Sequence, residues 1–337
     1  MRKEASLEQW KILYEAATKI KEQKPWEQLW DMDLIGIQYE EDDIVFFSIL
    51  GHGGDCYGVA VYEGYEGLNS FLMLTMQEQM NLSTEYAMFN QTNLSCYWGN
   101  REELSDKQRK IIKDLGYKYR GKNQWLYFMS FVPGYYPYNL DEAEVLRMSE
   151  YLQDLGLAIE SYKKFGGTVS FDKGNIFLLT FGEDKTTWHF GEAPLPFCAF
   201  QFGNLIITDE QLLDDLSKVE KCNVTLEADV SPMGVSVSDK KYDRPSNPVL
   251  SILLEAQSGT VVKCDMTQPN DDPMVMLAEM LIDFIFRYGA PKEICVSNVI
   301  VEAGVEQICE VCGIKLKRVK RLQNVEEFKR GMSRFGI

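Results

Sequence analysis

The sequence predicts two regions of different fold class. Residues 1–235 should form an α+β region with an antiparallel sheet, and residues 249–337 should form an α/β domain. Helical stripes and short strand-like runs occur in both regions, which indicates mixed structure. In the first region the earliest strand-like runs follow one another through a short turn, as in an antiparallel meander. In the second region strands alternate with helices, as in α/β domains.

The first region opens with a helix and a meander. Residues 7–22 carry apolar side chains at helical spacing and stop before Pro25, which cannot continue a helix. The glycine-rich loop at 51–55 is predicted to be a hairpin turn. A second helix is expected over 66–79. Strand-like runs lie at 34–38, 44–50, 56–63 and 94–98.

The rest of the first region shows a similar order of helix and strands. Ser105 and Gln108 have the spacing of a capping box, and Gly116 ends the helix that they begin. This similar order of elements leaves two interpretations open: an internal duplication, with sub-units 1–140 and 141–235, or a single domain. The remaining elements are a strand over 124–132, a helix over 141–163, strands near 175–181 and 185–190, a short helix from Thr208, and an extended run over 222–237.

A polar stretch separates the two regions. Residues 236–248 contain two prolines and few apolar side chains, which predicts a linker. Beyond it, strands at 249–257 and 260–267 are predicted to pair as a hairpin. Asp272, followed by Pro273, begins a helix with a buried apolar stripe. A strand, a helix, a strand and a helix complete the second region.

Charge is spread unevenly over the 337 residues. The net charge is −16, yet residues 315–337 hold eight basic residues against two glutamates. An acidic body repels nucleic acid, so phosphate contacts would have to come from this tail. The alternative is a solvated amphipathic end that complements the acidic body. The candidate phosphate contacts are Lys317, Arg318, Lys320, Arg321, Lys329, Arg330 and Arg334.

Cysteines and hydropathy point to the cytoplasm. The eight cysteines are scattered, and the first residues lack the apolar core of a signal peptide, so we expect reduced thiols in the cytoplasm. The most apolar helical stretch, residues 274–286, is interrupted by Glu279 and Asp283 and is too short to span a bilayer. We therefore expect no membrane association. No cofactor motif is present.

The whole chain resembles a bacterial family of uncharacterised two-region proteins. Pro25, Trp26, Leu29, Trp30 and Asp31 match its Pro-Trp…Leu-Trp-Asp signature, and the run FFSILGHGGDCYGVAVYEG resembles the strand-rich stretch that follows. The C-terminal part of the family resembles residues 245–337. The resemblance implies domain limits and assigns no chemistry.

A more distant resemblance covers only the C-terminal region. The run YGAPKEICVSN, which ends at Asn298, resembles a segment of integrase and transposase domains, which have the ribonuclease H fold. In that fold two or three acids at strand ends hold divalent metal. The resemblance places Glu255 on the first strand, Asp265 on the second, and Asn298 where the second aspartate would stand. Glu302 follows, but no third acid has a convincing helix context.

Several other residues suggest functional sites, but each also has a purely structural interpretation. Cys309 and Cys312 have the spacing of redox and zinc sites, but both fall on an apolar helix face, which favours buried structural thiols. His52 beside Cys56 suggests a nucleophilic dyad, but the surroundings are acidic and do not favour a thiolate. His189 is predicted to be packed or hydrogen-bonded. The aromatic segment 131–138 could line a groove or cover a sheet edge.

These observations favour a cytoplasmic binding or adaptor protein without enzymatic activity, whose partner is an unknown protein. The absence of a convergent set of titratable residues in the sequence motivates this hypothesis. The first alternative is nucleic-acid binding through the basic tail. The second is a divalent-metal-dependent nuclease in which Glu255 and Asp265 share a cation, which requires them to lie close together.

Overall fold

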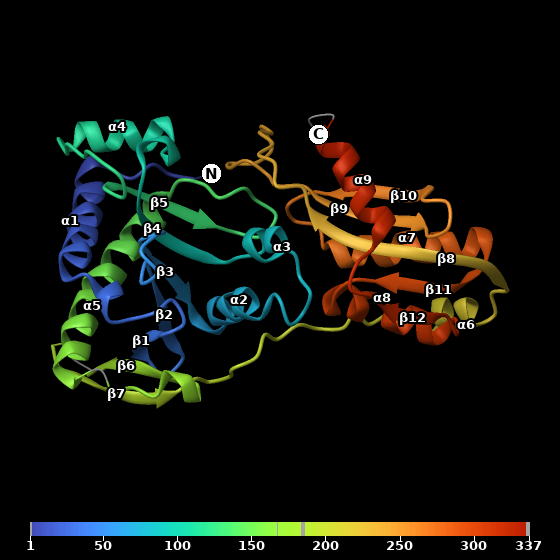
Figure 1. Cartoon of the computed structure of the whole chain (residues 1–337), viewed down its shortest axis with the longest axis horizontal. Coiled ribbons are helices and arrows are strands. Elements are labelled where there is room, and N and C mark those ends of the chain that lie inside the picture. Colours follow the sequence, from blue (N-terminus) through green and yellow to red (C-terminus); the bar gives the residue numbers. More distant parts are fainter. Residues whose placement is uncertain (1, 167, 183–185, 335–337) are drawn as a thin grey trace. The chain divides into compact units, whose positions relative to one another are not determined.

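The computed structural model describes residues 2–166, 168–182 and 186–334, with the side chains of the last two excepted (Figure 1). The chain divides into two compact units. The N-terminal unit comprises Met1–Thr75, Asn90–Pro133 and Pro137–Phe200, and the C-terminal unit comprises Met76–Phe89, Gly134–Tyr136 and Gln201–Ile337. Among the described residues, no helix is both long and apolar enough to cross a membrane.

The N-terminal unit is built on a seven-stranded sheet with the order β5-β4-β3-β2-β1-β6-β7. Neighbouring strands are antiparallel except for β1 and β6, which are parallel. The strands are β1 (Ile35–Glu40), β2 (Asp43–Leu50), β3 (Gly58–Glu63), β4 (Asn93–Gly99), β5 (Trp125–Phe131), β6 (Asn175–Phe181) and β7 (Trp188–Pro194).

Helices cover both faces of this sheet because its strands are apolar on both faces. One face packs against α1 (Leu7–Gln23), α4 (Asp106–Asp114) and α5 (Glu142–Phe165), through a core that includes Tyr14 and Phe128. The other face packs against α2 (Gly64–Met76). Capping boxes begin α1, α4 and α5, as the sequence predicts for α4. Short 3-10 helices lie at Pro25–Glu27, Arg101–Glu103 and Phe171–Lys173.

The long helix α5 explains the one parallel strand pair. It carries the chain from the β5 edge across the face of the sheet, so that β6 returns beside β1 in the same direction. The sheet is therefore antiparallel, as expected, except at this pairing. Residues 141–235 do not form a second sub-unit, because β6 and β7 extend the first sheet while β8 (Lys221–Pro232) belongs to the second.

The C-terminal unit is an α/β domain with a five-stranded sheet of order β10-β9-β8-β11-β12. β8, β9 and β10 are antiparallel neighbours, whereas β8, β11 and β12 are parallel. With β8 counted as its first strand, the sheet has the order 3-2-1-4-5, in which the first three strands are antiparallel neighbours and the last two run parallel to the first. The other strands are β9 (Val249–Glu255), β10 (Val261–Thr267), β11 (Ala290–Val296) and β12 (Lys315–Arg318).

Two layers of helices enclose this second sheet. α6 (Glu210–Ser217), α7 (Pro273–Tyr288) and α8 (Val299–Val311) cover one face. α9 (Gln323–Arg334) covers the other, where Leu322 and Val325 pack on β9. The short helix α3 (Thr84–Phe89) also belongs to this unit and contacts β8.

The predicted linker lies inside the C-terminal unit. Residues 236–248 connect β8 to β9, and their backbone is held by paired hydrogen bonds between Val237 and Ser246. The compact unit instead begins at Gln201. The expected boundaries 1–235 and 249–337 therefore differ from the structure, because β8 hydrogen-bonds to strands that follow it, and such long-range pairing leaves no local sequence signal.

Candidate functional site

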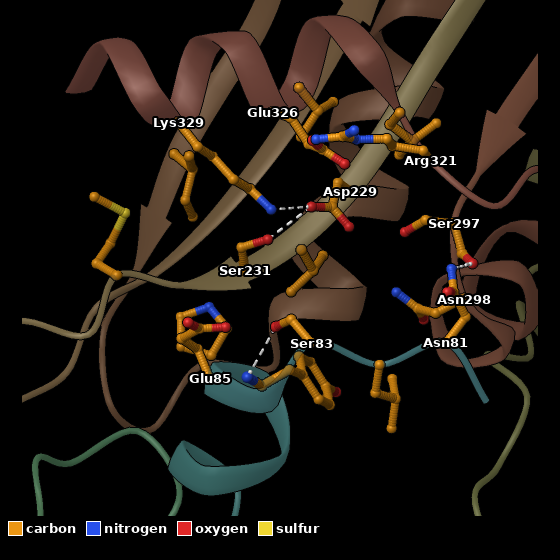
Figure 2. A pocket seen from close by; sticks show the side chains of 18 of the residues that line it. Asn81, Ser83, Glu85, Asp229, Ser231, Ser297, Asn298, Arg321, Glu326 and Lys329 are labelled. Atoms are coloured by element: carbon orange, nitrogen blue, oxygen red, sulfur yellow. Dashed lines mark hydrogen bonds and ion pairs between the residues drawn. The ribbon is translucent and has the colours of Figure 1, made fainter. Parts of the chain in front are cut away.

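A polar cavity of about 580 Å³ lies in the C-terminal unit, on the face of the sheet that α9 covers (Figure 2). Its lining comes from α3 and the residues before it, from β8, from the turn between β11 and α8, and from α9 with the turn that precedes it. The carboxyl ends of the parallel strands β8 and β11 meet at this place, which is where open α/β sheets usually bind ligands.

The central strand β8 presents a polar row beneath α9. Glu227, Asp229 and Ser231 alternate with apolar residues whose side chains pack in the α7 and α8 core. Because successive side chains point to opposite faces of a strand, all three polar side chains share the face toward α9. Buried acids on a central strand require partners, and the structure supplies one for each.

Asp229 forms the centre of the site. Its side chain is only 7% exposed, and Oδ2 accepts hydrogen bonds from Lys329 Nζ at 2.5 Å and from Ser231 Oγ at 2.6 Å (Figure 2). Lys329 reaches Asp229 from α9 and is 36% exposed. The ammonium group therefore neutralises the buried carboxylate where it meets the cavity.

Asn298 lies across the cavity from β8 and has a structural partner of its own. Its Oδ1 accepts hydrogen bonds from the backbone N–H groups of Ile300 and Val301, both at 3.0 Å, so it is the N-cap of α8. An uncharged amide caps a helix as well as an aspartate does. The residue where the resemblance would place an acid thus fixes the start of a helix.

Glu227 holds the N-terminus of α9 in the same way as Asn298 holds that of α8. Its carboxylate accepts the backbone N–H groups of Asn324 and Val325 at 3.1 Å, and Asn324 Nδ2 at 3.1 Å. A carboxylate at a helix N-terminus is favoured by the unpaired N–H groups and the helix dipole. This contact sets the position of α9, and hence of Lys329, over the sheet.

The two turns that border the cavity are held by further contacts. Asn81, in the left-handed conformation, donates from Nδ2 to the carbonyl oxygens of Ser297 at 2.6 Å and Lys320 at 3.1 Å. Arg321 donates from Nε to Glu326 Oε2 at 2.5 Å. This bond lowers the pKa of Glu326 and raises that of Arg321.

The two carboxylates expected to share a cation lie apart. Glu255 ends β9 and accepts the backbone N–H groups of Gln257 and Ser258, so it stabilises the hairpin turn and its pKa is lowered. Asp265 is exposed on the edge strand β10, where it pairs with Ser251. Ser251 and Glu255 are four positions apart on β9, which is roughly 13 Å at strand spacing. Among the described residues, no cluster of three potential ligands from His, Cys, Asp or Glu is arranged to hold a metal ion.

The candidate residues of the basic tail are dispersed, and three of the seven are paired with acids. Arg318 bonds Glu302 of α8 at 3.0 Å, whereas its neighbour Lys317 lies on the opposite face of β12 because strand side chains alternate. Lys320, Arg321 and Lys329 line the cavity, and the last two are paired with acids of the same unit. Arg330 is exposed and bonds a carbonyl of its own helix. The side chain of Arg334 lies outside the described residues. The acids thus come from the C-terminal unit itself.

The remaining candidates lie in separate parts of the described structure. No hydrogen bond joins His52 to Cys56, and His52 instead stacks on Trp30 with ring centroids 3.8 Å apart. His189 was expected to be packed or hydrogen-bonded; it is exposed on the edge strand β7, so the first of these expectations is wrong and the second stays a prediction. In the aromatic segment, Tyr138 extends the edge of β5 by bridging to Ser130, as the sheet-edge interpretation predicts.

Thiol reactivity should follow burial. Cys309 and Cys312 are buried, as predicted, and burial raises the pKa of Cys309 to about 12. We expect iodoacetamide at neutral pH to modify the exposed Cys56, Cys198 and Cys264 rapidly and to leave Cys309 and Cys312 unmodified until the protein is unfolded. Peptide mass spectrometry after timed quenching measures this. Rapid labelling of the Cys309–Cys312 pair in folded protein would contradict the expectation.

The sequence-based interpretation missed Asp229, and it singled out Lys329 only as a candidate phosphate contact of the basic tail. The available signal was the alternation of Glu227, Asp229 and Ser231 with apolar neighbours, which marks a strand with one polar face. A strand that is polar on one face is usually solvent-exposed on that face, so this pattern alone does not reveal that α9 covers it.

Comparisons with solved structures find partial similarity. The catalytic core domain of HTLV-2 integrase in complex with magnesium, in its trimeric form, aligns with a TM-score of 0.24 and 18% identity over 32% of this chain and 64% of that chain. A simian T-cell lymphotropic virus intasome in complex with PP2A regulatory subunit B56 gamma aligns with a TM-score of 0.25 and 15% identity over 32% and 37%. The chain spans less than two thirds of either. No curated protein matches it.

Family models cover most of the chain. Residues 212–333 match a family described as a domain of unknown function (DUF6930), and this match includes β8 with the C-terminal sheet. Residues 10–178, half of the chain, match a second family. The chain therefore belongs to the family described as a domain of unknown function (DUF7309).

Proposed function

We propose that this is a binding or adaptor protein, and that its C-terminal unit binds a small anionic ligand in the cavity without hydrolysing phosphodiesters. The observation that carries the proposal is the contact between Asp229 and Lys329 at 2.5 Å. A divalent cation would have to displace this ammonium from a carboxylate that is also bonded to Ser231. The ion pair holds the side chains of Asp229 and Lys329 in place, which supports a cavity that recognises its ligand through a fixed polar surface.

The lining of the cavity supports an anionic ligand of about nucleotide size. Its volume of about 580 Å³ lies within the usual range of small-molecule sites. Lys320 faces it and has no carboxylate within ion-pair distance among the described residues. Leu250, Leu322 and Val325 supply an apolar wall, and Asn81 and Asn298 supply amides. A ligand with one anionic group and a polar ring would match these features.

Thermal-shift measurements on the full-length protein test the proposal. Nucleoside monophosphates, nucleoside diphosphates and dicarboxylates are screened at fixed concentration, and we expect at least one to raise the melting temperature. A ligand at 100 times its Kd stabilises by about 2.7 kcal/mol. The shift should vanish in Lys320→Glu, because the ligand anion loses its counter-charge, and persist in Lys317→Glu, which changes the same charge outside the cavity.

Two results would contradict the proposal. One is equal loss of the shift in both variants, since binding would then depend on overall charge. The other is Mn²⁺-dependent cleavage of DNA or RNA by the purified protein that disappears in Asp229→Asn, because that carboxylate would then activate a metal ion rather than hold Lys329.

A further inference from the structure

The N-terminal unit carries a concentration of positive charge that the sequence-based interpretation did not identify. Residues 101–122 contain eight basic residues and four acidic ones, in a chain of net charge −16. They form the 3-10 helix before α4, α4 itself and the loop that leads to β5 (Figure 1). All of them belong to the N-terminal unit, so this feature is independent of the cavity described above.

These residues surround a concave site. A cavity of about 570 Å³ lies between α4, the following loop and the start of β5. We call it the cationic pocket. It is lined mainly by Arg101, Lys110, Lys113, Tyr117, Lys118 and Trp125. No acidic residue lines it among the described residues, which distinguishes it from the C-terminal cavity, where Asp229 and Glu326 stand among the cations.

Four of the five cations that line the cationic pocket have no acidic partner among the described residues, and the fifth, Arg109, pairs with Asp106 at 3.6 Å. In the described part of the chain, Arg101, Lys110, Lys113 and Lys118 have no carboxylate within 4.0 Å, although α4 carries Asp106 and Asp114. In the C-terminal tail, by contrast, Arg318, Arg321 and Lys329 each bond an acid. Gathering unpaired cations in one concavity is unfavourable in the free protein and raises the local concentration of anions.

Aromatic rings form part of the wall. The guanidinium of Arg101 lies 5.9 Å from the centroid of the Trp125 ring. Tyr119 packs edge-on to Trp125 at 6.1 Å and stacks on Tyr117 at 5.5 Å with an interplanar angle of 9°. Tyr117 also stacks on the buried Tyr14 of α1, which anchors the row of rings to the core. The rings are thus held rigidly beside the unpaired cations.

We propose that the cationic pocket binds single-stranded nucleic acid, with Lys110, Lys113 and Lys118 at phosphates and a base beside Trp125. Cations that follow a backbone, next to fixed aromatic rings, are the elements by which proteins hold single strands. A duplex would leave a concave aromatic wall without a partner, since its bases are already stacked. A membrane surface is disfavoured, because no large apolar side chain of 101–125 is strongly exposed.

Fluorescence anisotropy with the full-length protein tests the proposal. The probes are a labelled oligothymidylate, an oligouridylate of the same length and the matching duplexes, each in a salt series. We expect both single strands to bind more tightly than the duplexes, with log affinity falling linearly in log salt. Lys110→Glu/Lys118→Glu should weaken binding at least roughly tenfold at low salt, and Lys110→Gln/Lys118→Gln should reduce the salt slope by about 1.4.

A charge-matched control separates the cationic pocket from overall charge. Lys240→Glu/Lys241→Glu makes the same change at exposed positions of the C-terminal unit and should leave affinity nearly unchanged. Unaltered melting temperatures establish that all variants fold. The proposal is overturned if wild type binds no single strand at low salt, or if the control loses as much affinity as the pocket variant.

Two rival sites give different patterns, and either would also overturn the proposal. Loss of binding in Lys317→Glu/Arg330→Glu, with the pocket variant unaffected, would assign the interaction to the C-terminal tail. Flotation with phosphatidylglycerol vesicles that is lost in Lys110→Glu/Lys118→Glu, without binding of any oligonucleotide, would identify the cationic pocket as a membrane-binding surface. The outcome does not depend on the ligand of the C-terminal cavity, because the pocket variants at Lys110 and Lys118 lie in the N-terminal unit.

Discussion

Replacing Lys329 with methionine is expected to destabilise the C-terminal unit by about 2–4 kcal/mol. The substitution keeps much of the apolar stem but removes the ammonium that bonds Asp229, whose side chain is 7% exposed. Breaking a buried pair from one side costs more than the pair contributes, since the remaining charge stays buried. We place the effect below that of a fully buried pair because Lys329 is 36% exposed. Urea denaturation followed by circular dichroism measures the change in free energy.

The partner substitution provides the control. Asp229→Asn in the Lys329→Met background should recover most of the lost stability, because an amide bonded to Ser231 carries no charge to be neutralised. Lys317→Met removes the same charge from an exposed position and should change the free energy of unfolding by less than about 0.5 kcal/mol. If Lys329→Met were as mild as Lys317→Met, the contact between Lys329 and Asp229 would not stabilise the fold.

Local signals predicted the helices well. Ser105 with Gln108 and Asp272 with Pro273 mark helix starts that the structure has at Asp106 and Pro273. Capping depends on residues within three positions of each other, so the sequence shows it directly. Gly116 was expected to end the helix that Ser105 begins, and this is confirmed, because Gly116 directly follows the C-cap Leu115 and adopts the left-handed conformation with φ 81°.

Long-range pairing was not predicted. β8 lies between β9 and β11, and the second of these partners follows almost seventy residues later. The polar, proline-containing stretch 236–248 has the composition of a linker, but here it is a long connection between neighbouring antiparallel strands. A polar composition indicates that a segment is exposed to solvent. Because both a linker and a surface loop are exposed, composition alone does not distinguish them.

The same limit applies to the candidate site. Asn298 was singled out because its surroundings resemble a known segment, and it does line the cavity. Asp229 and Lys329 are a hundred residues apart and become neighbours only because Glu227 holds the N-terminus of α9 over β8. The acids that the resemblance singled out, Glu255 and Asp265, lie on the hairpin of β9 and β10. The sequence analysis took β9 as the first strand of the domain, whereas in the structure β8 precedes β9 in the same sheet.

Replacing Asn298 and Lys329 with acidic residues should create a metal-binding site in the cavity of the C-terminal unit. Asn298→Asp retains a good helix cap, and Lys329→Glu replaces the ammonium beside Asp229, so three acids would face one cavity. Without metal the double variant should be less stable than wild type because like charges are brought together in a buried place. Carboxylate oxygens bind Mn²⁺, and metal bound only to the folded state raises its stability, by about 2.7 kcal/mol at 100 times the Kd.

Melting curves with and without Mn²⁺ measure that gain, and calorimetric titration gives the stoichiometry. Wild type should show little response, because Lys329 already occupies the carboxylate of Asp229. Adding Asp229→Asn to the double variant should abolish the response, since the central ligand is lost. A response that survives this change, or its absence from the double variant, would mean that Asp229, Asn298 and Lys329 are not placed around one point. The lysine would then be a stabilising contact only, and the cavity would have no relation to a metal centre.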